Sequence, residues 1–541
     1  MMPSLEPARS WPPKLGGDSK QCRAAVVLAT ILGVGIALTA MIYLPFAARP
    51  FDVLDFGEFL PLLRDNPTFL TQLKALLRYY VEDQGRLNVV PYFFIVTKWY
   101  FFGWHVPLWQ TARFLEMWLL VAGVYVVLRE FGVARFGALC GAALFVVAPP
   151  GVGAWVRVTF AEPFGSLLLL LATHLAIKYQ EDERWRLRAA AIVMLLLTVA
   201  FTKEMLLAAV PWVLAVACTR APDGRFEPFR ASHRNRYLVG LAVTVLSLAG
   251  MAILWVALHA KAGALVGQYG AATVSSERFL APLILFLLPG YSLVLPDFPT
   301  ALIIADVAFL AIIAGGWWLA FRTAVDKSEM GRRLAIPLLL LLPGALMYVP
   351  WDGIQVTYGL PFLLSPAFLL GYGLTAIESH YKRGVVVLNR ALTILILVFC
   401  AISAHHFAHR SLALQHVNAG VAARMAASTA QDSTLVAVAR PQRLAWIGPG
   451  PTLGRYVLAT TGHPVVTPVR DILCAELEPA LHTRSKLLII SYHFRCGSLS
   501  QPDVSVRRYF RYLDLSTFAL SVDSIRADLL LHNPGGGSGS Q

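Results

Sequence analysis

Long runs of apolar residues separated by short polar connections dominate the chain between residues 24 and 404. A helix that crosses a bilayer needs about 20 mostly apolar residues, or somewhat fewer where neighbouring helices cover its ends. On this criterion the pattern predicts about eleven transmembrane helices. The predicted spans are residues 24–46, 111–129, 134–151, 161–180, 187–202, 204–219, 237–259, 301–321, 334–350, 357–377 and 385–404.

Two further apolar stretches, residues 89–104 and 278–296, could either cross the membrane or lie on its surface. Basic residues decide between these alternatives, because short cytoplasmic connections are enriched in Lys and Arg. All the basic clusters fall on one side of the membrane only if neither of these two apolar stretches is itself a transmembrane span. We therefore expect a cytoplasmic N-terminus, both stretches at the outer surface and an external C-terminal part. The clusters are Lys14/Lys20/Arg23, Arg129/Arg135, Lys178/Arg184/Arg186/Arg188, Arg220/Arg225/Arg230/Arg234/Arg236, Arg322/Lys327/Arg332/Arg333 and Lys382/Arg383.

The C-terminal part changes character after about residue 404. Leu435–Ala439 and Leu487–Ser491 have the length and composition of short buried strands, and turn residues separate them. We expect a transmembrane module over residues 1–404, with outer loops at 47–110 and 260–300, followed by a small periplasmic α/β domain over residues 405–534. Residues 535–541, GGGSGSQ, have the composition of a linker or tag remnant.

Composition supports a membrane protein. The 541 residues are 57% hydrophobic and 14% charged, whereas soluble chains carry about a quarter charged residues. The net charge of +14 alone would suit a nucleic-acid partner. The basic residues lie in short connections between apolar runs instead, which indicates that the partners are membrane lipids and not nucleic acid.

Two of the six cysteines, Cys474 and Cys496, lie in the polar C-terminal part. An oxidising compartment would allow a disulfide between them, and whether they are bridged stays open.

The outer loop 47–110 opens with three carboxylates, Asp52, Asp55 and Glu58, in the stretch FDVLDFGE. Carboxylates at a lipid boundary are retained when they are paired, hydrated or used in chemistry. An ordinary solvated loop is the alternative to a catalytic role.

The acidic stretch is followed by a long outer loop and by Gly85-Arg86 before the next apolar segment. This arrangement resembles that of the GT-C superfamily of membrane glycosyltransferases, and two further motifs add to the resemblance. Pro149–Arg157 with Glu162 is similar to the external proline, arginine and acid corner of such enzymes. Thr202-Lys203-Glu204 is similar to an outer element of several GT-C branches. The resemblance covers about residues 1–400 and implies a GT-C-like fold; for the last two motifs, structural ion pairs are the alternative.

The chain also departs from the pattern of that superfamily. Many relatives carry adjacent acids after the first span, whereas two residues separate Asp52 from Asp55 here. In the outer loop before the tenth span, where relatives often carry Arg-Tyr, this chain offers Gln355 and Tyr358.

The resemblance implies transfer of a sugar, with inversion, from a polyprenyl-phosphate donor to a hydroxyl of a cell-envelope glycan or lipid acceptor at the periplasmic face of a bacterial inner membrane. An attacking hydroxyl needs one general base, and a phosphate leaving group needs cations rather than a second acid. We expect Asp55 as the base, with Asp52 as second and Glu58 as third choice. The expected donor and substrate ligands are Arg86, Arg157, Lys203, Glu204, Glu58, Glu162, Gln355 and Tyr358.

No cofactor or metal-ligand set is assigned, although carboxylates at the site would permit Mg²⁺ or Mn²⁺. Two other functions stay open. A lipid-linked saccharide transporter or flippase should carry midplane charges and broken helices in duplicated halves, and no such repeat is visible. The second open function is that of a catalytically inactive GT-C-like scaffold subunit of a membrane assembly. The sugar, the acceptor and the oligomeric state are not determined by the sequence.

Overall fold

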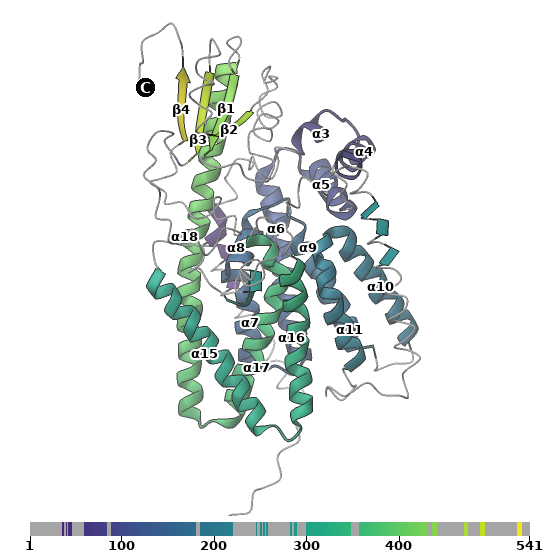
Figure 1. Cartoon of the computed structure of the whole chain (residues 1–541), viewed down its shortest axis with the longest axis vertical. Helices are drawn as coiled ribbons and strands as arrows, with labels where there is room; N and C mark the ends of the chain where they lie inside the picture. The colour runs from purple at the N-terminus through teal and green to yellow at the C-terminus, as the bar shows by residue number, and fades with distance from the viewer. Residues whose placement is uncertain are drawn as a thin grey trace, which may run out of the picture.

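The computed structural model describes residues 35–36, 39–40, 42–45, 59–83, 88–179, 184–219, 245, 249–250, 253–254, 256–257, 282–283, 286–288, 299–347, 356–429, 435–440, 470–473, 487–492 and 527–532. Upright helices form a bundle, and a small sheet lies at one end of it (Figure 1). In chain order the elements are α3 (Leu60–Arg64), α4 (Phe69–Leu77), the π-helix η2 (Arg78–Asp83), α5 (Val89–Phe102), α6 (Val106–Glu130), α7 (Arg135–Val147), α8 (Pro149–Val156), α9 (Glu162–Ile177), α10 (Trp185–Thr202), the 3-10 helix η3 (Glu204–Ala209), α11 (Val210–Thr219), α15 (Pro299–Thr323), α16 (Lys327–Met347), the 3-10 helix η6 (Val356–Leu363), α17 (Leu364–His380), α18 (Arg383–Thr429), β1 (Leu435–Arg440), β2 (Arg470–Leu473), β3 (Leu487–Tyr492) and β4 (Ala527–His532).

The bundle is that of a polytopic helical membrane protein. Within the described ranges, five helices are long and apolar enough to cross a bilayer, or six if the bent pair α7–α8 is one span. The predicted total of eleven stays a prediction, because the spans at residues 24–46 and 237–259 lie largely outside the described residues.

Helix α17 occupies the centre of the bundle. The whole apolar window of Gly359–His380 is buried, whereas only 17% of the window of Arg383–His409 in α18 is. The exposed apolar side chains of α18, such as Leu388 and Leu395, therefore suit contact with lipid.

Glycine allows two neighbours to approach the backbone of α17. A Cβ atom added to Gly316 of α15 would lie 2.4 Å from the Cα atom of Gly373. On another face of α17, a Cβ added to Gly137 of α7 would lie 2.6 Å from the carbonyl oxygen of Gly371. In lipid the hydrophobic effect does not drive two helices together. Small residues stabilise such helix contacts instead, because they let the backbones approach closely and increase van der Waals packing.

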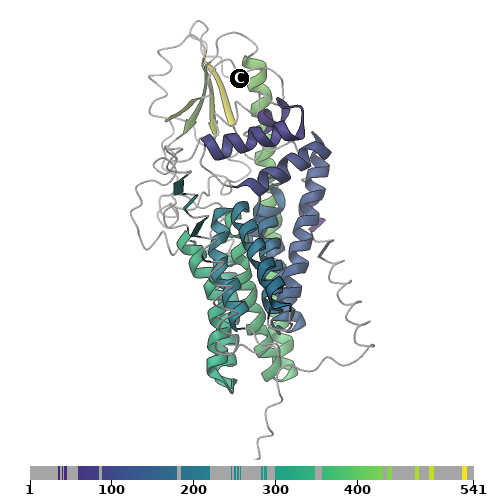
Figure 2. The ribbon, with the colours of Figure 1, turned by 90° about the vertical axis from the view of Figure 1, so that its right-hand side faces the viewer.

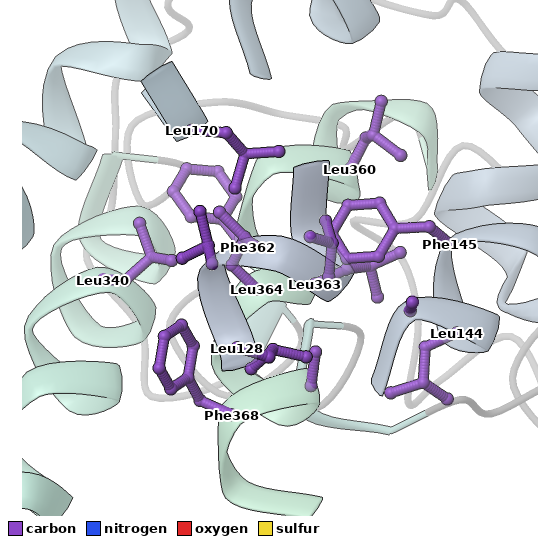
Figure 3. Packing of buried hydrophobic residues seen from close by; sticks show 14 of the residues in the cluster. Leu128, Leu144, Phe145, Leu170, Leu340, Leu360, Phe362, Leu363, Leu364 and Phe368 are labelled. Atoms are coloured by element: carbon purple, nitrogen blue, oxygen red, sulfur yellow. The ribbon is translucent and has the colours of Figure 1, made fainter. Parts of the chain in front are cut away.

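Large apolar side chains fill the space between α6, α7 and α17. Leu128, Phe145 and Phe368 are buried there beside Phe362 of η6 (Figure 3). This packing fixes α6 against the centre of the bundle, so that α6 can serve as a rigid support at its other end.

The predicted span 134–151 is not one straight helix, because the chain bends by 55° between α7 and α8; whether the pair crosses the membrane as one span stays a prediction. Pro149 and Pro150 lack the backbone N–H that would continue the helix of α7, and a proline disfavours helical geometry in the residue before it. Ala148 accordingly adopts an extended conformation, with φ −80° and ψ 150°.

The predicted helix 204–219 also begins differently. Lys203 is extended, with φ −160° and ψ 126°, and η3 then forms a tighter 3-10 helix before α11. Pro211 lies at the second position of α11 and cannot donate a hydrogen bond back into residues 204–209. The chain therefore turns sharply at Lys203 instead of entering an α-helix.

Helices α3, α4 and α5 lie across the same end of the bundle that carries the sheet (Figure 2). The 14 residues of α5 span about 21 Å, which is shorter than the hydrocarbon core of about 30 Å. This helix is therefore too short to cross a bilayer alone. Most of the other ambiguous stretch, 278–296, lies outside the described residues.

The sheet has the strand order β2-β1-β3-β4. Strand β1 pairs in parallel with β2 and β3, and β4 pairs antiparallel with β3. Helix α18 continues unbroken across residue 404, where we placed the domain boundary, and contacts β3 and β4. The last membrane helix thus carries the sheet on its end. The connections between the strands, with Cys474 and Cys496, lie outside the described residues.

The glycine contact between α15 and α17 gives a first prediction. Gly316→Ala should lower the free energy of unfolding by about 1–3 kcal/mol, since the new methyl group must push two backbones apart. Gly315→Ala is the matched control, because a Cβ atom there meets nothing within 4 Å. Thermal unfolding of both variants in detergent would test this; equal stabilities would contradict the close contact.

Candidate active site

Polar residues of α6 bind the chain where α8 leads into α9. The side chain of Gln110 donates to the carbonyl of Trp155 at 2.9 Å. The guanidinium of Arg113 donates through Nη2 to the carbonyls of Val158, at 2.8 Å, and Phe160, at 2.6 Å. Both α6 side chains are fully buried. They supply donors to carbonyls at the end of α8 and in the non-helical turn that follows, and these carbonyls need partners when buried.

Glu116, three residues further along α6, joins this turn to α5. Its carboxylate forms an ion pair with Arg113, with Oε2 2.9 Å from Nη1, and makes a very short contact with Lys98 Nζ of α5. Burial lowers the pKa of Lys98, and the charge of Glu116 opposes this shift. Arg113 and Glu116 are three positions apart and pair on one face of α6. Lys98 is the partner that the spacing did not reveal.

Arg157 and Glu162 stand at the two ends of the turn. Arg157 directly follows α8, is 6% exposed and lies with its guanidinium carbon 4.8 Å from the centre of the Phe160 ring. Glu162 is the first residue of α9 and is fully buried. A carboxylate at this position is stabilised by the positive end of the helix dipole.

Lys203 brings a further cation to Glu162. Its Nζ lies 3.2 Å from Glu162 Oε1, and the side chain is 14% exposed. From the sequence we treated Arg157 with Glu162 and Lys203 with Glu204 as separate pairs. The ion pair between Lys203 and Glu162 instead joins one member of each. The side chain of Glu204 lies outside the described part of the structure.

We call Lys98, Arg113, Glu116, Arg157, Glu162 and Lys203 the charge cluster. It contains four cations and two carboxylates. A small pocket beside it is lined by Lys98, Glu116, the turn residues 158–161 and Thr202, with apolar walls from Phe94 and Phe164. The pocket has room for water rather than for a sugar.

Buried polar atoms extend from the cluster into the bundle. Ser166 Oγ, one turn beyond Glu162, and Gln110 Oε1 are buried without a hydrogen-bond partner among the described residues. Buried polar groups in proteins are nearly always bonded to protein or ordered water, so such atoms mark places where water or a ligand binds.

The basic connections lie at the opposite end of the bundle. Glu130 at the end of α6 pairs with His174, and Arg390 near the start of α18 pairs with Glu378 and covers the ring of Phe136. Along α6, Arg113 and Glu130 are separated by about 25 Å. Figure 1 shows the connections α15–α16 and α17–α18 at this lower end, away from the sheet.

Several predicted site residues fall outside the described residues: Asp52, Asp55, Glu58, Arg86 and Gln355. Tyr358 lies in η6, but its side chain is not described. The described residues that flank the acidic stretch both contact the end that holds the charge cluster. Tyr43 stacks on Trp155 with ring centres 5.0 Å apart, and Phe59 packs against Tyr92 of α5.

Sequence reasoning missed Lys98 as a member of the site. A signal was available, because Lys98 is the only charged residue in the apolar stretch 89–104, and a charge in such a stretch needs a partner. Its partner Glu116 is 18 positions away on another helix, and no spacing rule reveals that contact. For metals, no group of three or more His, Cys, Asp or Glu residues within the described ranges is arranged to hold an ion.

The Lys203–Glu162 pair generates a second prediction. Lys203→Met should lower the free energy of unfolding by about 3–5 kcal/mol, since it leaves a fully buried carboxylate without its cation. The double variant Lys203→Met/Glu162→Gln should recover part of this loss. Thermal unfolding in detergent measures both. A double variant no more stable than the single one would show that the ion pair does not govern the site.

Among known proteins, this chain is similar to solved structures but not to any known sequence family. No family model and no curated protein sequence matches the chain. Similar solved structures include ArnT from Cupriavidus metallidurans bound to undecaprenyl phosphate, with a TM-score of 0.46, 11% identity and coverage of 87% of this chain and 93% of that one. The same protein in the apo state gives a TM-score of 0.48 at 10% identity, with the same coverage. The oligosaccharyltransferase of Archaeoglobus fulgidus, in a complex with Zn and sulfate, gives 0.41 at 11% identity and covers 81% of this chain and 62% of that one.

Proposed function

We propose that this chain is a GT-C-type membrane glycosyltransferase that moves a sugar, with inversion, from a polyprenyl-phosphate donor to an acceptor hydroxyl at the outer face of a bacterial inner membrane. The observation that carries the proposal is the charge cluster, with its four cations and two carboxylates, at the end of the bundle away from the basic connections. Buried charges at such a place are costly and are retained for structure or function.

The distribution of basic residues supports the side of the reaction. Connections that carry Lys and Arg gather at the end remote from the cluster, as at the cytoplasmic ends of membrane helices. With that end in the cytoplasm, the cluster, α3–α5 and the sheet face the periplasm. A polyprenyl donor and a cell-envelope glycan or lipid acceptor would meet there.

The residue types fit the chemistry of phosphate departure. A phosphate leaving group is already a stable anion and gathers negative charge as the sugar leaves. We assign Arg157 and Lys203 to this phosphate, together with Arg86, because Arg binds phosphate with two parallel hydrogen bonds. Glu162 holds Lys203 in place through the ion pair. Glu204, Gln355 and Tyr358 are assigned to the substrate only by the resemblance.

The acceptor hydroxyl must lose its proton as it attacks, and a nearby carboxylate serves as the base. We assign this role to Asp55, with Asp52 as second and Glu58 as third choice. The assignment is supported by the flanks of the acidic stretch, since Tyr43 and Phe59 pack at the end that holds the charge cluster. Carboxylates there would also accept Mg²⁺ or Mn²⁺.

One observation favours a second function, that of a lipid-linked saccharide transporter. The break between α7 and α8 is of the kind that transporters use at their binding sites. The charge cluster lies towards one end of the helices rather than at mid-depth, which favours the enzyme. An inactive scaffold would share the cluster but would transfer no sugar.

Loss of the base should abolish transfer without abolishing donor binding. Asp55→Asn is expected to slow sugar transfer by about 10²–10⁴-fold, the usual contribution of a general base. Turnover of a radiolabelled polyprenyl-phosphate sugar by purified protein would measure this, with Asp52→Asn in parallel. Wild-type rates in both variants would remove the proposed role of the acidic stretch.

Reversal of a phosphate ligand should instead weaken binding. Arg86→Glu is expected to reduce affinity for the polyprenyl-phosphate donor by about 10–100-fold, because a charge-assisted hydrogen bond contributes about 1.5–3 kcal/mol. Arg78→Glu is the matched control, since Arg78 is an exposed arginine of the same loop that pairs with Glu82. Equal affinities for Arg86→Glu and wild type would demote Arg86 to a residue that only reaches towards the membrane surface.

A further inference from the structure

The polar residues Gln110, Arg113 and Glu116 recur every three positions along α6 and therefore share one helix face. Together they contact the end of α8, the turn 157–161 and α5. Three separate pieces of the chain are thus attached to one rigid helix, and two of them, α5 and the turn, line the pocket.

Arg113 is the central member of this face. Its buried guanidinium holds two carbonyls of the turn, Val158 and Phe160, while also pairing with the carboxylate of Glu116. Its Nη2 serves both carbonyls while Nη1 faces the carboxylate, whereas a lysine ammonium is a compact point charge on a flexible stem.

Glu116 divides its charge between two cations on different elements, Arg113 of α6 and Lys98 of α5. If Lys98 moved away, the carboxylate would be left with Arg113 alone and would draw the guanidinium away from the turn. Conversely, loss of Arg113 would leave Glu116 and Lys98 as a partly buried pair without its third member. Breaking such a network costs free energy in a low dielectric, so a displacement of α5 affects the turn held by Arg113, and a displacement of the turn affects α5.

We infer that Arg113 and Glu116 are positioning residues, which couple the placement of the surface helix α5 to that of the turn carrying Arg157. The pocket lies between these two parts, since Lys98 and Glu116 line it together with Val158–Ala161. The inference rests on the proposed function only for the ligand, a lipid-linked phosphate held by Arg157. By linkage, a ligand that fixes the turn also fixes α5.

Hydrogen exchange in the full chain, reconstituted in lipid nanodiscs, tests the coupling without any ligand. Lys98→Gln should speed exchange by about 10-fold in residues 157–161, although the carbonyls of Val158 and Phe160 are held by Arg113 and not by Lys98. Arg113→Lys should likewise speed exchange in α5. Arg333→Lys is the matched control, a buried arginine paired with Glu329 at the opposite end, and should leave both segments unchanged.

If each variant loosened only its own element, the coupling would be refuted. Should Arg113→Lys fail to fold, Glu116→Gln provides the same test, because it removes the charge that both cations share. Lys98→Arg keeps the pair with Glu116 and should restore wild-type exchange in the turn; a purely local packing role for Lys98 would not be rescued in this way.

Binding of undecaprenyl phosphate, used as the probe, tests the consequence for the site. Arg113→Lys should weaken binding by about 10-fold or more, while Arg333→Lys should bind like wild type. Unchanged affinity of Arg113→Lys would overturn the positioning role. Failure of the wild-type protein to bind the probe would instead refute the proposed function, while the exchange experiment would still decide the coupling.

Discussion

Pairing of buried charge is the constraint on which the polar end of this protein depends. Inside a helical bundle in lipid, a charged group or a backbone carbonyl cannot hydrogen-bond to bulk water, so other groups of the protein must pair with it. Arg113 meets this requirement for the turn 157–161, Glu116 meets it for Arg113 and Lys98, and Lys203 meets it for Glu162. The local geometry follows from these pairings, because each charge can reach its partner in few arrangements.

The rest of the bundle serves as a platform for this end. Close backbone contacts at Gly316 and Gly137 hold α15 and α7 against the central helix α17, and large apolar side chains lock α6 to the same centre. Since α6 is a continuous helix from Val106 to Glu130, its apolar half is fixed in the core while its polar half projects to the charge cluster. A rigid scaffold with a polar end is a suitable arrangement for binding a charged head group at a membrane surface.

The sequence predicted those features that are local or periodic. The apolar run 111–129 lies within α6, and 187–202 lies within α10, because length and hydropathy alone identify a buried or lipid-facing helix. Leu435 and Leu487 begin β1 and β3, as the pattern of the C-terminal part indicates. The same rules overlooked the bend before Pro149, where two prolines override an apolar run that looks continuous. The contacts of Lys98 with Glu116 and of Lys203 with Glu162 join distant parts of the chain, and only the packing of the helices creates them.

The most direct measurement is an experimentally determined structure of the full chain in nanodiscs with a bound polyprenyl phosphate. If the charge cluster is the phosphate site of a glycosyltransferase, the phosphate will lie within hydrogen-bonding distance of Arg157 or Lys203, with the acidic stretch around Asp55 facing it. A phosphate bound halfway through the bundle, or at the end that carries Arg390, would contradict that claim.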